Sequence, residues 1–218
     1  MPAGLPDRES YLDRWSDLHG GYDPRGNVLV HRWLLLSYVV ARPLASARVE
    51  PDLVTAGAVV VTAIGTWCAA ADGGWLVLSA ALLALGGLLD NVDGAVAVLQ
   101  DRVTRWGAVL DAVADRVSDL LLVGALLAAG APWEVAAAGA ALMLLQEYVR
   151  ARAAGVGMTE VGVVTVWERP TRVIVTTTFL VASAVLDDPW PTLGAWAWVG
   201  LGVVGCAQLL VVVRRRLR

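Results

Sequence analysis

The stretch LLDNVDGAVAVLQDRVTRWGAVLDAVAD, residues 88–115, places four aspartates inside an otherwise apolar helical pattern. Asp90 and Asp93 are three residues apart, and Asp111 and Asp115 are four apart, so each pair shares one face of a helix. An ionised carboxylate in the hydrocarbon of a membrane is costly, which makes an acid there a functional hypothesis by default. The whole chain is therefore interpreted from these four positions.

The composition is that of a membrane protein. The chain has 218 residues, of which 57% are hydrophobic, and its mean hydropathy is +0.63, which is more apolar than an ordinary soluble domain. All 17 basic residues are arginine and the net charge is −3, so nothing points to a nucleic-acid partner. Cys68 and Cys206 lie in apolar runs and are interpreted as small buried hydrophobes. We predict an all-α integral membrane protein.

Six segments are candidates for crossing a bilayer, which takes roughly 20 mostly apolar residues. They are residues 53–71, 75–98, 106–129, 133–153, 170–186 and 192–213. Residues 28–48 are apolar but interrupted by basic residues, which predicts an N-terminal amphipathic helix lying at the interface; a seventh span is the alternative. Residues 1–27 are polar and acidic and form a predicted cytoplasmic extension, and residues 49–218 form the six-helix domain.

The placement of arginine predicts the orientation. Arginines precede the first span, flank two of the connections and end the chain, whereas the other three connections have none. Trp75, Trp133 and Trp190 lie beside the arginine-free connections, as an outer aromatic belt would. We predict a multi-pass protein of the cell membrane with both termini and the aspartates on the cytoplasmic side.

The four aspartates are predicted to lie at matched depth. Asp90 follows Trp75 by fifteen residues and Asp115 precedes Gly130 by fifteen, and each interval is about 22 Å of helix. Two antiparallel helices would therefore bring the two pairs together, where bare carboxylates would repel one another. The alternative, that the acids are loop residues at a short turn, fits only Asp101, to which we assign no role.

Divalent metal is the predicted solution to that repulsion. An all-oxygen set suits Mg²⁺ or Mn²⁺, and the lack of nearby His or Cys argues against zinc. Small residues surround the acids and would let two helices approach while leaving room for a flat ligand. These small residues are Gly94, Ala95, Ala97, Gly107 and Ala108.

The spacing resembles the signature of the CDP-alcohol phosphotransferase family, D-x2-D-G-x2-A-R-x8-9-G-x3-D-x3-D. The positions in register are Asp90, Asp93, Gly94, Ala97, Gly107, Asp111 and Asp115. The segments EPDLVT (50–55), EYVRARAAGVGM (147–158) and ERPTRVIV (168–175) are also similar to family segments. The last two resemble one branch, the actinobacterial phosphatidylinositol phosphate synthases.

The resemblance implies a phospholipid-synthesising transferase. A CDP-linked lipid such as CDP-diacylglycerol would be the donor, CMP would leave, and two Mg²⁺ or Mn²⁺ ions would bridge the diphosphate. Asp90, Asp93 and Asp111 would be metal ligands, and Asp115 would be a further ligand or the general base. The implied nucleotide-binding residues are Asp52, Thr55, Asp90, Gly94, Ala97 and Gly107. The family is commonly dimeric, and the glycines of the last span are consistent with close helix packing or a dimer contact.

The implied acceptor-phosphate site consists of Arg150, Arg152 and Arg172. Arginine suits phosphate because its guanidinium binds two oxygens at once. The alternative is that these residues only set the topology and contact anionic lipid. Inositol phosphate is the acceptor we favour, and glycerol phosphate or another anionic acceptor stays open.

Val98 departs from the signature, which has arginine after Ala97. Arg102 or Arg105 would substitute if the helix continued, or the enzyme is altered in rate or substrate. The competing hypotheses are a non-catalytic relative that binds the nucleotide-lipid, and a cation transporter that uses the aspartates. Against the transporter, the acids all lie near one side of the predicted membrane.

Overall fold

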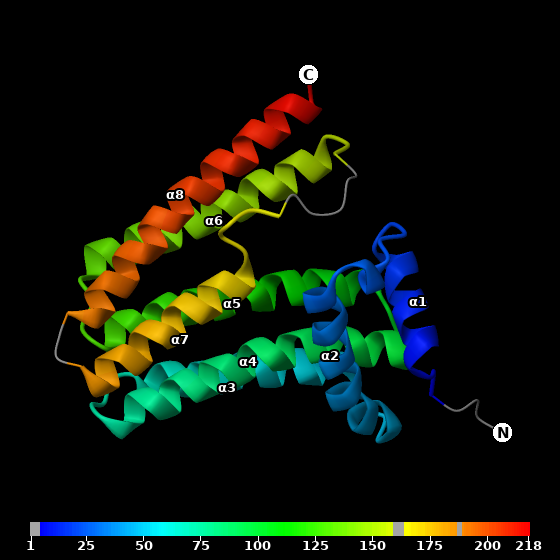
Figure 1. Cartoon of the computed structure of the whole chain (residues 1–218), viewed down its shortest axis with the longest axis horizontal. Coiled ribbons are helices and arrows are strands. Elements are labelled where there is room, and N and C mark those ends of the chain that lie inside the picture. Colours follow the sequence, from blue (N-terminus) through cyan, green and yellow to red (C-terminus); the bar gives the residue numbers. More distant parts are fainter. Residues whose placement is uncertain (1–4, 159–163, 187–188) are drawn as a thin grey trace. The chain divides into compact units, whose positions relative to one another are not determined.

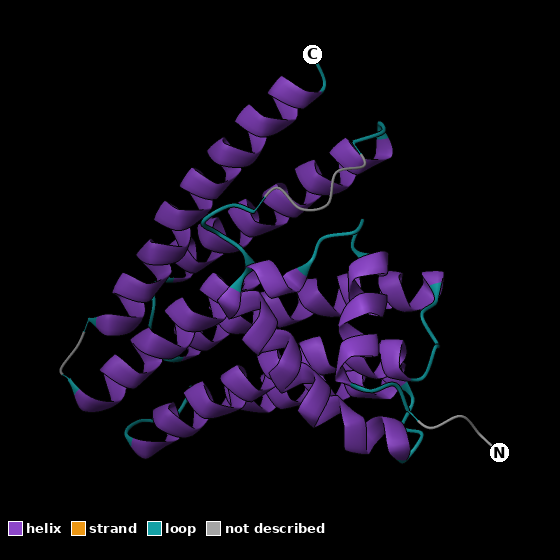
Figure 2. Cartoon of the chain, turned by 45° about the vertical axis from the view of Figure 1, so that its right-hand side comes forward, coloured by secondary structure: helices purple, strands orange, loops and turns teal. Residues whose placement is uncertain are grey.

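The structure is a computed structural model that describes residues 5–158, 164–186 and 189–218. The described residues are helices joined by short turns and contain no strand, which confirms the all-α class (Figure 2). The helices, labelled in Figure 1, are α1 (Arg8–Leu18), α2 (Val28–Ser46), α3 (Pro51–Cys68), α4 (Gly74–Leu99), α5 (Arg105–Ala128), α6 (Trp133–Gly155), α7 (Arg169–Val185) and α8 (Trp190–Arg216), with a 3-10 turn, η1 (Pro24–Gly26).

The chain folds as two compact units. The N-terminal unit is the chain up to Ala58 together with Leu88–Asp115, and the C-terminal unit is Val59–Gly87 together with Arg116–Arg218. Helices α3, α4 and α5 each contribute residues to both. Each unit has its own apolar core.

Three described helices are long and apolar enough to cross a membrane. They are α3, α4 and α8, which correspond to the first, second and sixth predicted spans. Helices also occupy the other three predicted spans, but α5 and α6 carry several ionised side chains and α7 has only 17 residues. The helical segments are thus confirmed, whereas the count of six spans rests on the sequence argument.

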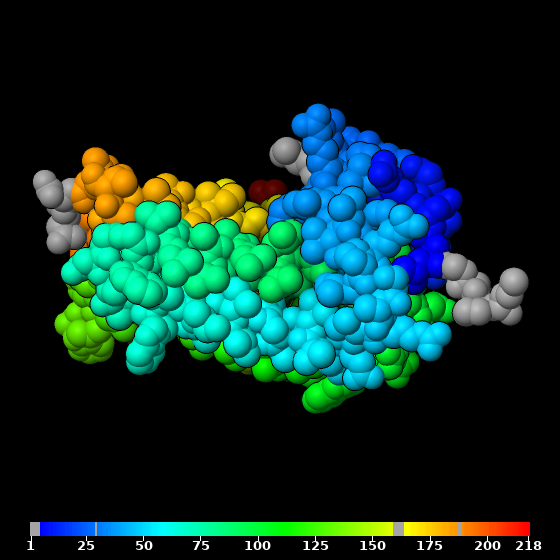
Figure 3. Space-filling model, turned by 90° about the horizontal axis from the view of Figure 1, so that it is seen from below, coloured from blue at the N-terminus to red at the C-terminus, as the bar shows by residue number. Residues whose placement is uncertain are grey.

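The predicted polar extension contains a folded helix, α1. The Asp7 side chain caps it by accepting from the Ser10 N–H at 2.9 Å. Tyr11 and Leu12 are fully buried in the core of the N-terminal unit, and burial raises the pKa of Tyr11 to about 12. Helix α1 packs against α2, and Figure 3 shows the dark-blue residues of α1 against the lighter blue of α2. The extension is therefore part of the fold.

In the C-terminal unit, α6 runs alongside α8, and α7 also packs on α8 (Figure 1). The rings of Trp167 and Trp198 meet edge to face with centroids 5.0 Å apart, and both side chains are fully buried. A Cβ added to Gly205 would lie 2.6 Å from the Trp167 Cβ. The predicted close packing of α8 is therefore found within the chain, and a dimer contact stays a prediction.

Candidate functional site

Helices α4 and α5 bring three of the four aspartates together in the N-terminal unit. One carboxylate oxygen from each of Asp90, Asp111 and Asp115 lies within 4.8 Å of the other two. Asp90 and Asp115 are half-buried, so the group is reached from solvent on one side and backed by protein on the other. The spacing read from the sequence thus places these acids as one group.

This group fits a divalent ion of the magnesium type. Ligand oxygens lie about 2.1 Å from Mg²⁺, so opposite ligands are about 4.2 Å apart. The three oxygens lie within 4.8 Å of one another, so they are near enough to share one such ion. The donor set is all carboxylate oxygen, which favours Mg²⁺ or Mn²⁺ over softer metals.

Asp93, the fourth aspartate, is buried and held differently. Its carboxylate accepts hydrogen bonds from the Thr55 hydroxyl and from the Gly94 N–H. Thr55 is itself buried, on α3. The predicted nucleotide residue Thr55 and the predicted ligand Asp93 are therefore direct partners, and Thr55 fixes the orientation of that carboxylate.

The predicted nucleotide-binding residues lie in the same unit as the aspartates. A Cβ added to Gly94 would meet nothing within 4 Å, so the α4 surface beside the acids is open. A Cβ added to Gly107 would lie 3.1 Å from the Thr104 hydroxyl and 4.0 Å from an Asp52 oxygen. Thr104 caps α5 by accepting from the Gly107 N–H at 2.9 Å. Ala97 is half-buried on α4.

Helix α4 ends at Leu99, directly after the departure at Val98. Asp101 adopts a left-handed conformation with φ 56°, and the Arg102 N–H donates to the Ala97 carbonyl at 2.9 Å. Arg102 pairs instead with Glu50, at 3.4 Å on the surface. The hypothesis that α4 continues and presents Arg102 or Arg105 in place of the missing arginine is wrong, because the chain turns before reaching them.

The predicted acceptor arginines lie in the C-terminal unit and differ in exposure. Arg152 is exposed and Arg150 is half-buried, whereas Arg172 is completely buried. The terminal nitrogens of Arg172 donate to Asp119 Oδ2 at 2.6 Å, to Glu147 Oε1 at 3.0 Å and to the Trp167 carbonyl at 3.0 Å. Arg172 thereby ties α7 to α5 and α6.

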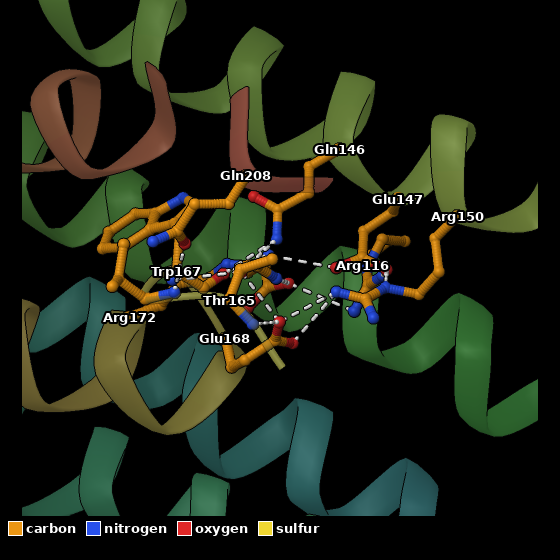
Figure 4. Close-up of polar contacts among 11 residues, drawn as sticks. Arg116, Gln146, Glu147, Arg150, Thr165, Trp167, Glu168, Arg172 and Gln208 are labelled. Carbon is orange, nitrogen blue, oxygen red and sulfur yellow. Dashed lines mark hydrogen bonds and ion pairs between the residues drawn. The ribbon is translucent and has the colours of Figure 1, made fainter. Parts of the chain in front are cut away.

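Acidic side chains also pair with Arg116 and Arg150 of this unit (Figure 4). Glu147 accepts from Arg116 at 2.8 Å as well as from Arg172. Glu168 pairs with Arg150 at 2.9 Å and accepts from the Thr165 N–H and hydroxyl, each at 2.8 Å. The result is a network of three arginines and three carboxylates.

The acids of this network were not predicted from the sequence. Asp119 and Glu147 lie inside predicted spans, where an ionisable side chain is a functional candidate by default. The position of an ionisable residue inside a predicted span could therefore have identified both acids. Glu168 lies between elements, next to the N-terminus of α7, and only the fold shows its role.

Comparison with known proteins identifies the family. Residues 48–213 match the sequence model of the CDP-alcohol phosphatidyltransferases. The archaetidylinositol phosphate synthase of Methanothermobacter thermautotrophicus is 31% identical over 186 residues, covering 81% of this chain and 94% of that protein. The phosphatidylinositol phosphate synthase of Mycobacterium tuberculosis strain H37Rv is 32% identical over 197 residues, covering 80% and 83%.

Solved structures agree with this match. The crystal structure of the Mycobacterium tuberculosis phosphatidylinositol phosphate synthase with CDP-DAG bound has a TM-score of 0.67 at 28% identity and covers 81% of this chain and 92% of that one. The structure of that synthase with manganese and citrate has a TM-score of 0.68 at 29% identity, covering 81% and 88%.

The chain belongs to the CDP-alcohol phosphatidyltransferase family. It is a helical membrane protein and a transferase, and its carboxylate group fits the Mg²⁺ or Mn²⁺ that such a transfer requires.

Asp111→Asn should weaken Mn²⁺ binding. Removing one charge and one donor oxygen should lower the affinity by at least about tenfold, because even outer-shell changes cost about 10–100-fold. Titration calorimetry on the purified protein measures this. Asp101→Asn is the matched control, since Asp101 lies in the left-handed turn after α4, a conformation that asparagine also adopts. Equal affinities in the two variants would contradict the site.

Proposed function

We propose that this chain transfers a phosphatidyl group from CDP-diacylglycerol to a hydroxyl of inositol phosphate and releases CMP. The observation that carries the proposal is the group of Asp90, Asp111 and Asp115, which lies in register with the family signature. Support for the acceptor comes from the relatives of about 31% identity, which are phosphatidylinositol phosphate and archaetidylinositol phosphate synthases.

Each aspartate has a proposed role in the transfer. Asp90, Asp93 and Asp111 would hold two divalent ions, and such ions would neutralise the diphosphate and polarise its phosphoryl oxygens. Thr55 keeps the Asp93 carboxylate in place. Asp115 is a further ligand or takes the proton from the acceptor hydroxyl as it attacks the β-phosphorus. Positioning and charge neutralisation, rather than covalent catalysis, lower the barrier.

The nucleotide is proposed to lie on the open surface of α4. Gly94 has free space where a side chain would be, and Ala97 is one turn further along the helix. Asp52 lies close to Gly107, so the start of α3 and the start of α5 border the same region. Backbone there approaches the ligand closely because no side chain projects from the glycines.

The acceptor phosphate is proposed to bind the arginines of the C-terminal unit in two ways. Arg152 is exposed and Arg150 is half-buried, so both are assigned direct contact with phosphate. Arg172 is buried and fully engaged by Asp119 and Glu147, so it is assigned to positioning. A different anionic acceptor, such as glycerol phosphate, would use the same two arginines, and the acceptor panel described below separates the two acceptors.

Wild-type protein with CDP-diacylglycerol, Mn²⁺ and a panel of acceptors should release CMP, fastest with inositol phosphate. Asp115→Asn should abolish release, because it removes both a ligand charge and the proposed base. The readout is CMP formation by chromatography, with Asp101→Asn as the active control. If no acceptor in the panel supports CMP release while Mn²⁺ and cytidine nucleotide still bind, the chain is the non-catalytic relative. Val98, which replaces the arginine of the family signature, makes this outcome important to test.

Arg152→Ala should impair acceptor binding, whereas Arg172→Ala should impair stability. Arg152→Ala should raise the KM for inositol phosphate about tenfold or more, since it removes a charged hydrogen bond, and leave the thermal midpoint unchanged. Arg172→Ala should cost up to about 3–5 kcal/mol of stability, because the fully buried Asp119 loses its partner at 2.6 Å and keeps only Arg116, at 3.3 Å. The measurements are acceptor kinetics and thermal unfolding in detergent. An unchanged KM in Arg152→Ala would remove that residue from the acceptor site.

The topology is proposed to comprise six spans with both termini in the cytoplasm. It is supported by the arginine placement, by helices at all six predicted segments, and by a mean hydropathy that qualifies three of them. Single cysteines at Asp72 and Gly130, in a cysteine-free background, should react with an impermeant maleimide from outside intact cells. A cysteine at Asp101 should react only after lysis. Reversed labelling would overturn the orientation.

A further inference from the structure

The C-terminal turn of α4 has no basic residue, and the residue at the position of the signature arginine is buried. The family signature places arginine at position 98, in that turn, yet the turn contains no basic residue in this chain. Val98 is instead buried, with 7% of its surface exposed. It belongs to the apolar core of the N-terminal unit, together with Tyr11 and Leu12 of α1. Val98 and the apolar face of α1 therefore belong to the same core.

A guanidinium reaches this turn from α1. Arg14 Nη1 donates a hydrogen bond to the Val98 carbonyl at 3.5 Å. The last carbonyls of a helix carry partial negative charge, and a cation near them is stabilising. The positive charge that the sequence lacks at position 98 is thus supplied by a residue 84 positions earlier in the chain.

Several contacts fix α1 in this place. The Tyr38 hydroxyl on α2 donates to the Pro6 carbonyl at 3.3 Å, and the Tyr11 and Tyr38 rings lie 5.4 Å apart. Arg25 of η1 pairs with Glu9 at 2.9 Å and with Asp13 at 2.8 Å on α1. Helix α1 is therefore anchored at its start, on its apolar face and along its polar face.

We propose that α1 takes the place of the signature arginine: its apolar face seats on Val98, and Arg14 supplies the missing cation to the end of α4. Arg14 is a positioning residue, acting through the end of the helix that carries Gly94 and Ala97. The exchange is reciprocal, because an arginine at position 98 would have to fit among Tyr11, Leu12 and the other apolar residues of this core. The seating of α1 is independent of the proposed reaction, and only its effect on the donor rests on that function.

Hydrogen exchange of the full-length protein tests the packing of α1 against the core that contains Val98, and it does not require turnover. Val98→Arg should displace α1 and speed amide exchange over residues 8–18 at least tenfold. Val98→Ile, which keeps the position apolar, should leave that exchange within about twofold of wild type, since similar-sized apolar exchanges are tolerated. Unchanged exchange over α1 in Val98→Arg would overturn the proposal.

Kinetics of Arg14 variants test the cation. Arg14→Ala should raise the KM for CDP-diacylglycerol severalfold and leave the KM for the acceptor unchanged, because the end of α4 that carries Gly94 and Ala97 loses its cation; the thermal midpoint should fall only slightly, since the contact is long and Arg14 is exposed. Arg14→Lys should retain most of the donor affinity, and Arg14→Ala with Val98→Arg should recover part of what Arg14→Ala alone loses.

Two results would overturn the role of Arg14. One is a donor KM in Arg14→Ala equal to that of wild type. The other is a loss of donor affinity that occurs only together with a fall in the thermal midpoint and that neither Arg14→Lys nor the double variant recovers. That result would make α1 a packing element only. If wild-type protein releases no CMP, the proposed function fails, while the exchange experiment still decides where α1 sits.

Discussion

Mutual repulsion among the carboxylates of Asp90, Asp111 and Asp115 is the constraint on which the N-terminal unit depends. Their oxygens lie within 4.8 Å of one another, and Asp90 and Asp115 are half-buried. Unit charges at such a distance repel by about 3–4 kcal/mol per pair at an effective dielectric of about 20. Helices α4 and α5 hold this geometry in place through backbone hydrogen bonds and core packing. The fold thus presents a site whose charge a bound divalent cation would neutralise.

In the C-terminal unit, by contrast, arginine side chains neutralise the carboxylates. Arg116, Arg150 and Arg172 face Asp119, Glu147 and Glu168, so the network is compensated by its own side chains. Breaking such a buried pair is costly, which makes the network a structural tie among α5, α6 and α7. An incoming phosphate at Arg150 would have to compete with Glu168 and Glu147. Arg152 is exposed, so phosphate would reach it from solvent.

Local spacing could be predicted from the sequence, and long-range partners could not. The intervals among the aspartates determine which helical faces they share, so the grouping of Asp90 with Asp115 followed from helix geometry alone. The burial of Arg172 could not be foreseen, because its partner Asp119 is 53 residues away. The same holds for α1, whose two fully buried residues, Tyr11 and Leu12, are too few to stand out in a polar segment. The end of α4 was predicted to within one residue, since the second span was expected to end at residue 98 and Asp101 to lie in a turn; the left-handed conformation of Asp101 was not predicted.

The missing arginine at position 98 illustrates how a residue elsewhere in the chain can perform the physical role of a motif residue. Positive charge close to the last carbonyls of α4 is stabilising, and the electrostatic benefit depends on distance rather than on which segment carries the charge. Arg14 meets that distance from another helix, at 3.5 Å from the Val98 carbonyl. Once the cation comes from α1, position 98 is free to become apolar, and its burial then helps to hold α1 in place. The buried valine and the Arg14 contact are therefore two parts of one arrangement at the end of α4.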